Sequence, residues 1–175
     1  VNIIGVHLDR KGTMGNVEKI IAKIESNGAK AKFFNVNAAD DEKRDKVLDE
    51  MSSLISKDEK KIKILLHSLA FGSLKPYLSD DSSSNVTQKN MEMTIDVMAN
   101  SIVYWTQGVV KRSLFSSNGR IYGMTSAGSR KIWPTYGPVS AAKSALESHI
   151  RQMAVELAPQ RITANSLCAG VTLTP

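Results

Sequence analysis

Short apolar segments alternate with longer stretches of helical hydrophobic periodicity, and this alternation restricts the possible folds more than any other feature of the sequence. Five segments are expected to be strands: residues 1–9, 31–37, 61–68, 120–124 and 161–167. Four helices are expected between them: residues 16–27, 41–55, 90–113 and 138–157. This order predicts an open parallel sheet with helices on both faces, an α/β layered fold. No repeat or linker divides the chain, so we expect a single domain over residues 1–175.

The composition excludes several classes of protein. The chain has 175 residues, of which 42% are apolar and 23% are charged, so it is not a disordered segment. No apolar run approaches the roughly 20 residues of a membrane helix, and no secretory signal opens the sequence, so we expect a cytoplasmic protein. Cys168 is the single cysteine and the three histidines are scattered, so neither a disulfide framework nor a metal site is expected.

The sequence lacks one feature of a dinucleotide-binding sheet, the glycine-rich turn between the first strand and the first helix. No GxGxxG pattern or related cluster occurs among the 11 glycines. Either the fold does not bind a nucleotide, or the printed chain begins after this turn. Residue 1 already lies in an expected strand and Pro175 lies in a loop after the last one, so we expect a part of a longer polypeptide that lacks both ends.

A tyrosine and a lysine lie seven residues apart at the beginning of the last expected helix. The chain passes from a strand end at Met124 through hydroxyl residues to Tyr136, and Lys143 follows almost two helical turns later. A phenol has an ordinary pKa of about 10, which a neighbouring ammonium group lowers. Beside a reduced nicotinamide, such a pair is able to stabilise or protonate an oxygen that gains negative charge.

This segment and three others, residues 141–147, 153–157 and 161–170, resemble the short-chain dehydrogenase/reductase family. The usual tyrosine of that family stands four residues before the lysine, where this chain has Val139. The longer Tyr-x6-Lys spacing is similar to the enoyl-acyl-carrier-protein reductase branch. Leu66-His-Ser-Leu-Ala-Phe71 is similar to the His-Ser-(Ile/Leu)-(Gly/Ala)-Phe sequence of the same branch.

The resemblance implies a Rossmann-like, doubly wound parallel sheet in three α/β/α layers, without the first βα unit and the C-terminal end. It also implies an oxidoreductase that transfers hydride from NADH or NADPH to the C=C bond of an enoyl thioester on acyl-carrier protein, in fatty-acid synthesis. Tyr136 would stabilise the enolate oxygen, and Lys143 would bind the nicotinamide ribose and hold positive charge near that oxygen. The other positions expected to contact the cofactor are Asp9, Asn37, Ala38, Ser68, Leu69, Ala70, Gly170, Val171, Thr172 and Thr174.

The chain departs from the family pattern at three positions. Ser126 stands where many enoyl reductases have a second tyrosine, and it also matches the catalytic serine of carbonyl reductases, so it is a third candidate catalytic residue. Met98 stands where many relatives have an asparagine of a proton relay, which argues against ordinary ketone reduction. Val171 replaces a proline that often follows Ala-Gly.

The residues after the first expected strand give two signals about the cofactor. An acidic residue such as Asp9 accepts hydrogen bonds from both hydroxyls of the adenine ribose and favours NAD, whereas Arg10 and Lys11 would suit the additional phosphate of NADP. We favour NAD slightly. Among the other polar residues, His67 is expected to be a satisfied core histidine, His149 to lie at the surface and Cys168 to be a small buried residue.

Two alternative functions remain open, a 3-oxoacyl or carbonyl reductase of the same family and a non-catalytic Rossmann scaffold. The formal net charge of +6 is mild and the basic residues are dispersed, so no nucleic acid or membrane partner is expected. The positive charge would suit an acidic carrier protein. In the family, the helices expected at residues 90–113 and 138–157 commonly form subunit contacts, so the resemblance implies a homotetramer.

Overall fold

The computed structural model describes residues 1–57 and 61–170. Residue contacts divide the chain into two compact units, Val1–Asp58 and Glu59–Pro175, and each has a parallel sheet of its own. The alternation of strands and helices confirms the expected α/β fold, while one domain over the whole chain stays a prediction. No helix in the two described ranges has both the length and the apolar character needed to cross a membrane.

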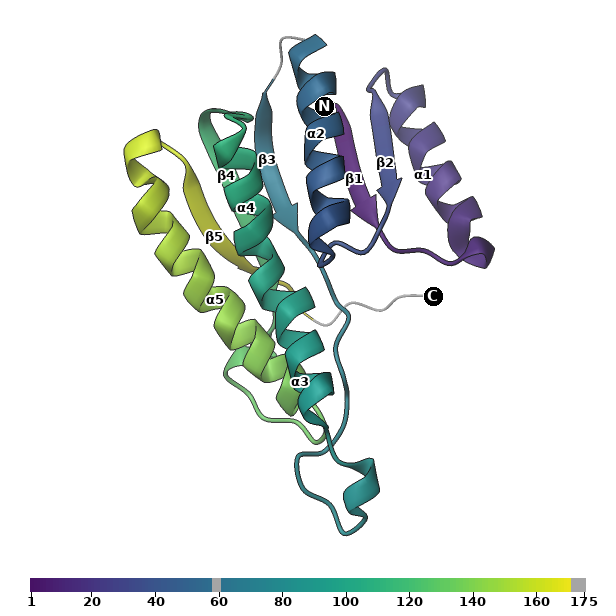
Figure 1. Cartoon of the computed structure of the whole chain (residues 1–175), viewed down its shortest axis with the longest axis vertical. Coiled ribbons are helices and arrows are strands. Elements are labelled where there is room, and N and C mark those ends of the chain that lie inside the picture. Colours follow the sequence, from purple (N-terminus) through teal and green to yellow (C-terminus); the bar gives the residue numbers. More distant parts are fainter. Residues whose placement is uncertain (58–60, 171–175) are drawn as a thin grey trace. The chain divides into compact units, whose positions relative to one another are not determined.

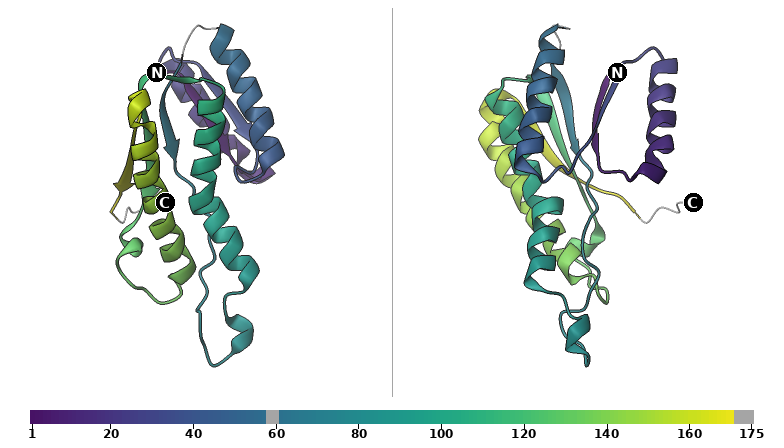
Figure 2. Two further views of the ribbon diagram at one scale, coloured as in Figure 1. Left: turned by 60° about the vertical axis from the view of Figure 1, so that its left-hand side comes forward. Right: turned by 45° about the vertical axis from the view of Figure 1, so that its right-hand side comes forward.

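The first unit is built on two parallel strands, β1 (Ile3–His7) and β2 (Ala31–Asn35). Helix α1 (Met14–Ser26) connects the strands, helix α2 (Asp41–Lys57) follows them, and the two helices lie on opposite faces of this sheet (Figure 2). Gly28, whose φ is +75°, turns the chain after α1. The buried apolar side chains of the unit are Val17, Phe34, Val47, Leu48, Met51 and Ile55.

The second unit has three parallel strands in the order β3 (Ile62–His67), β4 (Phe115–Thr125) and β5 (Thr163–Cys168). Its helices are α3 (Gln88–Ile95), α4 (Ser101–Lys111) and α5 (Gly137–Leu157). Helices α4 and α5 run side by side against the sheet (Figure 1). Short 3-10 turns lie at Lys11–Thr13, Ser82–Ser84, Ala127–Ser129 and Ala158–Gln160.

The core of the second unit lies between the sheet and these helices. It contains Met98, Ile102, Ile121, Val139, Ala142, Leu146, Ile150 and Met153, all less than one-tenth exposed. Gly123 on β4 allows α5 to approach closely, because a Cβ atom there would lie 3.2 Å from the side chains of Leu146 and Ile150. Pro138 occupies the first turn of α5, where the missing amide hydrogen costs no helical bond.

Several expected element boundaries were wrong, and three of these differences are the most informative. The helix expected at residues 90–113 is interrupted by a π-helical turn at Asp96–Asn100, between α3 and α4. The strand expected at 120–124 begins earlier, at Phe115, and passes through an irregularity in its register with β3 where Asn118 has a φ of +63°. The strand expected at 1–9 ends at His7, so Asp9 lies two residues beyond it.

Two expected side-chain environments were also wrong. Cys168 is exposed, like the other residues in the second half of β5. His149 is half-buried rather than at the surface, because it faces the π-helical turn, where its Nε2 atom lies 3.1 Å from Oδ1 of Asn100.

The core contact of α5 gives a stability prediction. Leu146 is completely buried, so Leu146→Ala should lower the free energy of unfolding by about 2–5 kcal/mol through lost burial and a residual cavity. Val155→Ala on the same helix is the control, because Val155 is 73% exposed and should change stability by about 0.5 kcal/mol or less. Urea unfolding followed by circular dichroism measures both. Equal effects would contradict the packing of α5 on β4.

Candidate active site

The expected tyrosine lies at the junction between a loop and α5. Tyr136 is the residue that precedes the helix, and its half-buried ring packs edge-on against Trp133, with the ring centroids 5.4 Å apart and an interplanar angle of 89°. Gly128 is required beside this ring, because a Cβ atom there would overlap with the ring carbons of Tyr136. The tyrosine is therefore fixed by a glycine on one side and an aromatic ring on another.

Ser126 stands at the end of β4, directly beside the phenol. Its Oγ atom lies 3.5 Å from the hydroxyl oxygen of Tyr136 and accepts a hydrogen bond of 3.2 Å from the backbone amide of Gly128. The backbone bond orients the serine, so that the two hydroxyl groups face each other. The structure thus brings together two of the three residues expected to be catalytic.

Lys143 reaches the same end of β4 from α5. Its side chain is buried, with 6% exposed area, and Nζ donates a hydrogen bond of 2.7 Å to the carbonyl oxygen of Met124. Burial lowers the pKa of the Lys143 ammonium group. Lys143 thus contacts Met124 within β4, and Tyr136 contacts Ser126, the residue that follows β4.

His67, at the end of β3, is buried next to the π-helical turn. Its Nε2 atom lies 2.7 Å from Oγ of Ser101, and this hydroxyl donates to the carbonyl oxygen of Val97 at 2.8 Å, so Nε2 carries the hydrogen. Burial, with the positive charge of Lys143, lowers the pKa of His67 to about 4. The expected core histidine is confirmed, but it is not fully satisfied, because buried Nδ1 has no hydrogen-bond partner among the described residues.

The segment after β3 holds three of the residues expected to line a cofactor. Ser68 and Ala70 are exposed and Leu69 is half-buried, immediately beyond the carboxyl end of the strand. The chain then passes close to the helices at Gly72, where a Cβ atom would lie 2.8 Å from the side chain of Met98. These residues are therefore placed at the strand end by tight packing further along the loop.

Glu147 belongs to this end of the sheet but was not identified from the sequence. It accepts a hydrogen bond of 2.7 Å from Oγ1 of Thr125, the last residue of β4. Burial acts to raise its pKa, but hydrogen bonds from Thr125 and Ser129 and the charges of Arg130 and Arg151 outweigh burial and lower it. The carboxylate ties the strand end to α5. In the sequence, only the position of Glu147, one helical turn after Lys143, indicated that it belongs to the site.

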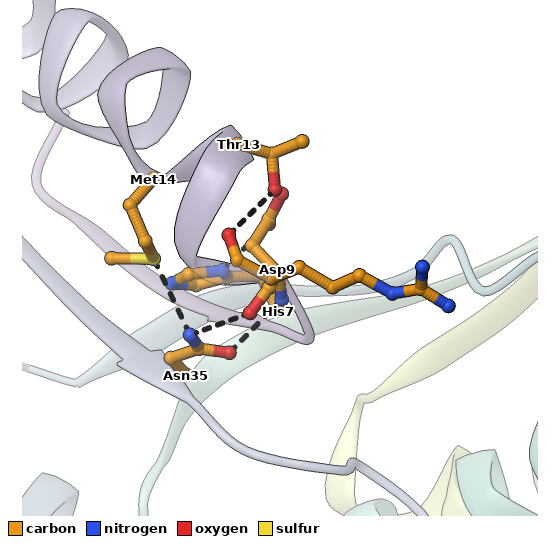
Figure 3. Close-up of polar contacts among 6 residues, drawn as sticks. His7, Asp9, Thr13, Met14 and Asn35 are labelled. Carbon is orange, nitrogen blue, oxygen red and sulfur yellow. Dashed lines mark hydrogen bonds and ion pairs between the residues drawn. The ribbon is translucent and has the colours of Figure 1, made fainter.

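A second cluster of polar residues lies in the first unit, around the expected cofactor residue Asp9 (Figure 3). Oδ2 of Asp9 is 2.8 Å from Nδ1 of His7, the last residue of β1. The side-chain amide of Asn35, the last residue of β2, accepts from the backbone nitrogen of Asp9 and donates to its carbonyl oxygen, both at 3.0 Å. Hydrogen bonds from Thr13 and His7 lower the pKa of Asp9. Neither His7 nor Asn35 was identified from the sequence as part of a site.

The remaining expected cofactor residues have simpler positions. Asn37 and Ala38 follow β2 and are half-buried, and Oδ1 of Asn37 accepts from the backbone nitrogen of Ala39 at 3.0 Å. Gly170 is exposed, two residues after β5. Val171, Thr172 and Thr174 lie outside the described residues.

Comparison of the sequence with known protein families assigns the chain to one of them. Residues 1–175 match the family described as enoyl-(acyl carrier protein) reductase. The chain belongs to this family. It is thus part of the short-chain dehydrogenase/reductase group, in the enoyl-reductase-like branch that its motifs resemble.

Individual relatives are distant and longer than this chain. The 1-cyclohexenylcarbonyl-CoA reductase of Streptomyces collinus is 41% identical over 58 residues, which are 33% of this chain and 21% of that protein. The enoyl-acyl-carrier-protein reductase (NADH) FabI of Synechocystis is 30% identical over 110 residues, 63% of this chain and 41% of that one. The corresponding Nostoc protein is 26% identical over 156 residues, 89% of this chain and 57% of that one. The chain thus spans little more than half the length of this relative.

Solved structures confirm a Rossmann-like α/β fold. An enoyl-acyl-carrier-protein reductase from Anaplasma phagocytophilum in complex with NAD has a TM-score of 0.75 and 22% identity, over 97% of this chain and 60% of that one. A short-chain dehydrogenase/reductase from Serratia marcescens has a TM-score of 0.79 and 16% identity, over 94% of this chain and 62% of that one. At these identities the likeness concerns the fold.

The buried imidazole predicts a pH dependence of stability. Because the pKa of His67 falls from 6.5 to about 4 on folding, the unfolded chain binds a proton that the folded chain refuses, so stability should fall as the pH falls from 6.5 towards 4. The loss approaches about 3 kcal/mol at the lower end of this window. His67→Gln keeps a donor for Ser101 but does not titrate, so its urea midpoint should fall less.

His149→Gln is the matched control and should retain the wild-type slope. Parallel curves for the wild-type protein and His67→Gln would contradict the burial of a neutral imidazole at residue 67.

Proposed function

We propose that this protein is an oxidoreductase that uses NAD(P)H to reduce the C=C bond of an enoyl thioester. The observation that carries the proposal is the meeting of Tyr136 and Lys143 at the end of β4, with the phenol oxygen 3.5 Å from Ser126 and the ammonium group on the Met124 carbonyl. Carboxyl ends of parallel strands are where ligands bind in α/β sheets. The family supports this reaction class.

Each unit, taken by itself, has residues whose chemistry suits part of a reduced dinucleotide. The ammonium group of Lys143 uses one donor for Met124, which leaves donors for the hydroxyls of a ribose. In the second unit, exposed Ser68 and Gly170 also follow the ends of β3 and β5. In the first unit, Asp9 is an ionised, partly exposed carboxylate suited to the hydroxyls of a ribose. When bound, a reduced nicotinamide supplies the hydride.

The side chains of this protein would then manage the charge that develops on the substrate. Hydride addition to the carbon β to the carbonyl would push an electron pair onto the thioester oxygen, and the resulting enolate would then take up a proton from solvent at the α carbon. The Tyr136 hydroxyl donates a hydrogen bond to this oxygen, while Lys143 supplies positive potential from a buried position, where electrostatic interactions are stronger than in water. Ser126 holds the phenol in the required orientation.

The proposed substrate is an acyl thioester on acyl-carrier protein, as the names of the Synechocystis and Nostoc relatives suggest. The relative from Streptomyces collinus is named for a CoA substrate, so the carrier is part of the proposal. The net charge of +6 suits docking of an acidic carrier. We further propose a cytoplasmic homotetramer assembled through α4 and α5, which light scattering can test.

A 3-oxoacyl or carbonyl reductase is the second candidate. The contact between Ser126 and Tyr136 favours it, because a serine beside the tyrosine is what the resemblance implies for carbonyl reductases. The usual tyrosine position of such enzymes is occupied here by Val139, which is 5% exposed and has no proton to donate. We therefore place the enoyl reductase first.

Tyr136→Phe tests the proposed chemistry. Loss of the hydroxyl should reduce kcat for NADH-dependent reduction of a crotonyl thioester by about 10²–10³-fold, because one donor to the developing oxyanion is removed. Tyr122→Phe, in the middle of β4, is the control and should retain activity. Full activity of Tyr136→Phe would overturn its role, and a preference of the wild-type protein for a 3-oxoacyl thioester would favour the second candidate.

Asp9→Ser tests the proposed adenosine site. Removal of the carboxylate should weaken NADH binding by about tenfold, because charge-assisted hydrogen bonds to the ribose are lost, and should weaken NADPH binding much less. Glu25→Gln on the exposed surface of α1 is the control. Isothermal calorimetry with each dinucleotide measures both. An unchanged NADH affinity would place the adenosine elsewhere.

A further inference from the structure

The backbone around Asp9 is fixed from the neighbouring strand. Asp9 lies beyond the last ladder residue of β1, but the side chain of Asn35 bonds both its amide nitrogen and its carbonyl oxygen at 3.0 Å (Figure 3). Asn35 is in register with His7, so the end of β2 reaches across to hold the residues that follow β1. The amide of Asn35 also lies 3.3 Å from Sδ of Met14, at the start of α1.

The carboxylate of Asp9 is held separately, by Thr13 and by His7. An ionised carboxylate only accepts hydrogen bonds, so Nδ1 of His7 is the donor in the 2.8 Å contact with Oδ2. The side chain of His7 is 16% exposed and that of Asp9 is 31% exposed, so the donor is more buried than the acceptor. Oδ2 of Asp9 therefore accepts a hydrogen bond from a partly buried side chain of the same unit.

The imidazole ring has its own support. It packs against Phe33 on β2, with ring centroids 6.1 Å apart and an angle of 55°. The Phe33 ring occupies space that only a glycine leaves open, because a Cβ atom on Gly5 would lie 2.6 Å from its ring carbons. Gly5 thus leaves room for the ring of Phe33, Phe33 packs against His7, and His7 contacts one oxygen of Asp9.

A fixed carboxylate separates two kinds of ribose. The vicinal hydroxyls of an unmodified ribose are donors that match a carboxylate, whereas a phosphate on that ribose is an anion that it repels. Arg10 is exposed and follows Asp9 in the sequence. If the Asp9 carboxylate were free to rotate, it would turn towards the Arg10 guanidinium group and no longer discriminate between the two kinds of ribose. Selection depends on holding the carboxylate in place as well as on its presence.

We propose that His7 is a positioning residue that acts through Asp9 to make the site select NADH over NADPH. This inference rests on the proposed function, since it requires a dinucleotide at the end of β1. His7 makes no contact with the cofactor in this account. Its contribution is the hydrogen bond from Nδ1, and the ring itself serves to place that donor.

Two substitutions separate the donor from the ring. His7→Phe keeps an aromatic ring against Phe33 but removes the donor, whereas the amide nitrogen of His7→Asn occupies nearly the position of Nδ1 and restores it. We expect the ratio of the NADPH and NADH dissociation constants, measured by calorimetry on the full chain, to fall by about tenfold in His7→Phe and to remain near wild type in His7→Asn. Thermal melting of both variants reports their folding separately.

The outcomes distinguish this inference from the proposed function. A loss of selectivity in His7→Phe with recovery in His7→Asn supports the role of His7. NADH binding with the wild-type ratio in His7→Phe overturns it and leaves the proposed function intact, as does equal loss of selectivity in both variants. A wild-type protein that binds neither dinucleotide overturns the proposed function and this inference together.

Discussion

The hydrogen bond from the buried Lys143 ammonium group to the carbonyl oxygen of Met124 is the interaction on which the candidate site depends. A charge at 6% exposure is costly unless it is paired or used, and here one backbone carbonyl is its hydrogen-bond partner in the described part of the chain. Close packing of α5 over Gly123 brings the lysine to β4, and the same helix begins at Tyr136. Helix packing therefore places the ammonium group of Lys143 on β4, close in sequence to the contact between Ser126 and Tyr136.

The two clusters described here follow the same structural logic. In each, a residue at the end of a strand carries the chemistry, and a side chain from a neighbouring element fixes it: Glu147 bonds Thr125 beside Ser126, and Asn35 bonds the backbone of Asp9. The two supporting side chains are hydrogen-bonded, while Ser126 and Asp9 keep partial exposure. Support of this kind is what holds a site in its working geometry before a ligand arrives.

The sequence predicted the parts of the site that have a strong local pattern. The seven-residue spacing of Tyr136 and Lys143 and the alternation of strands and helices were sufficient for the fold and for one end of β4. The π-helical turn at 96–100 has no such local pattern. It is accompanied by a tertiary contact, the hydrogen bond between Ser101 and His67, which joins segments far apart in the sequence. His7 and Asn35 meet through strand register, which links residues 28 positions apart and cannot be seen in either segment alone.

The most direct test of the account follows the hydride by mass spectrometry. Crotonyl-acyl-carrier protein is incubated with NADH deuterated at the transferable position, and the acyl product is analysed for wild type and Tyr136→Phe. The account predicts a butyryl product from the wild-type protein with one deuterium at the carbon β to the carbonyl, and almost none from the variant. Unchanged crotonyl thioester with a wild-type protein that binds NADH, or equal labelling by both proteins, would contradict it.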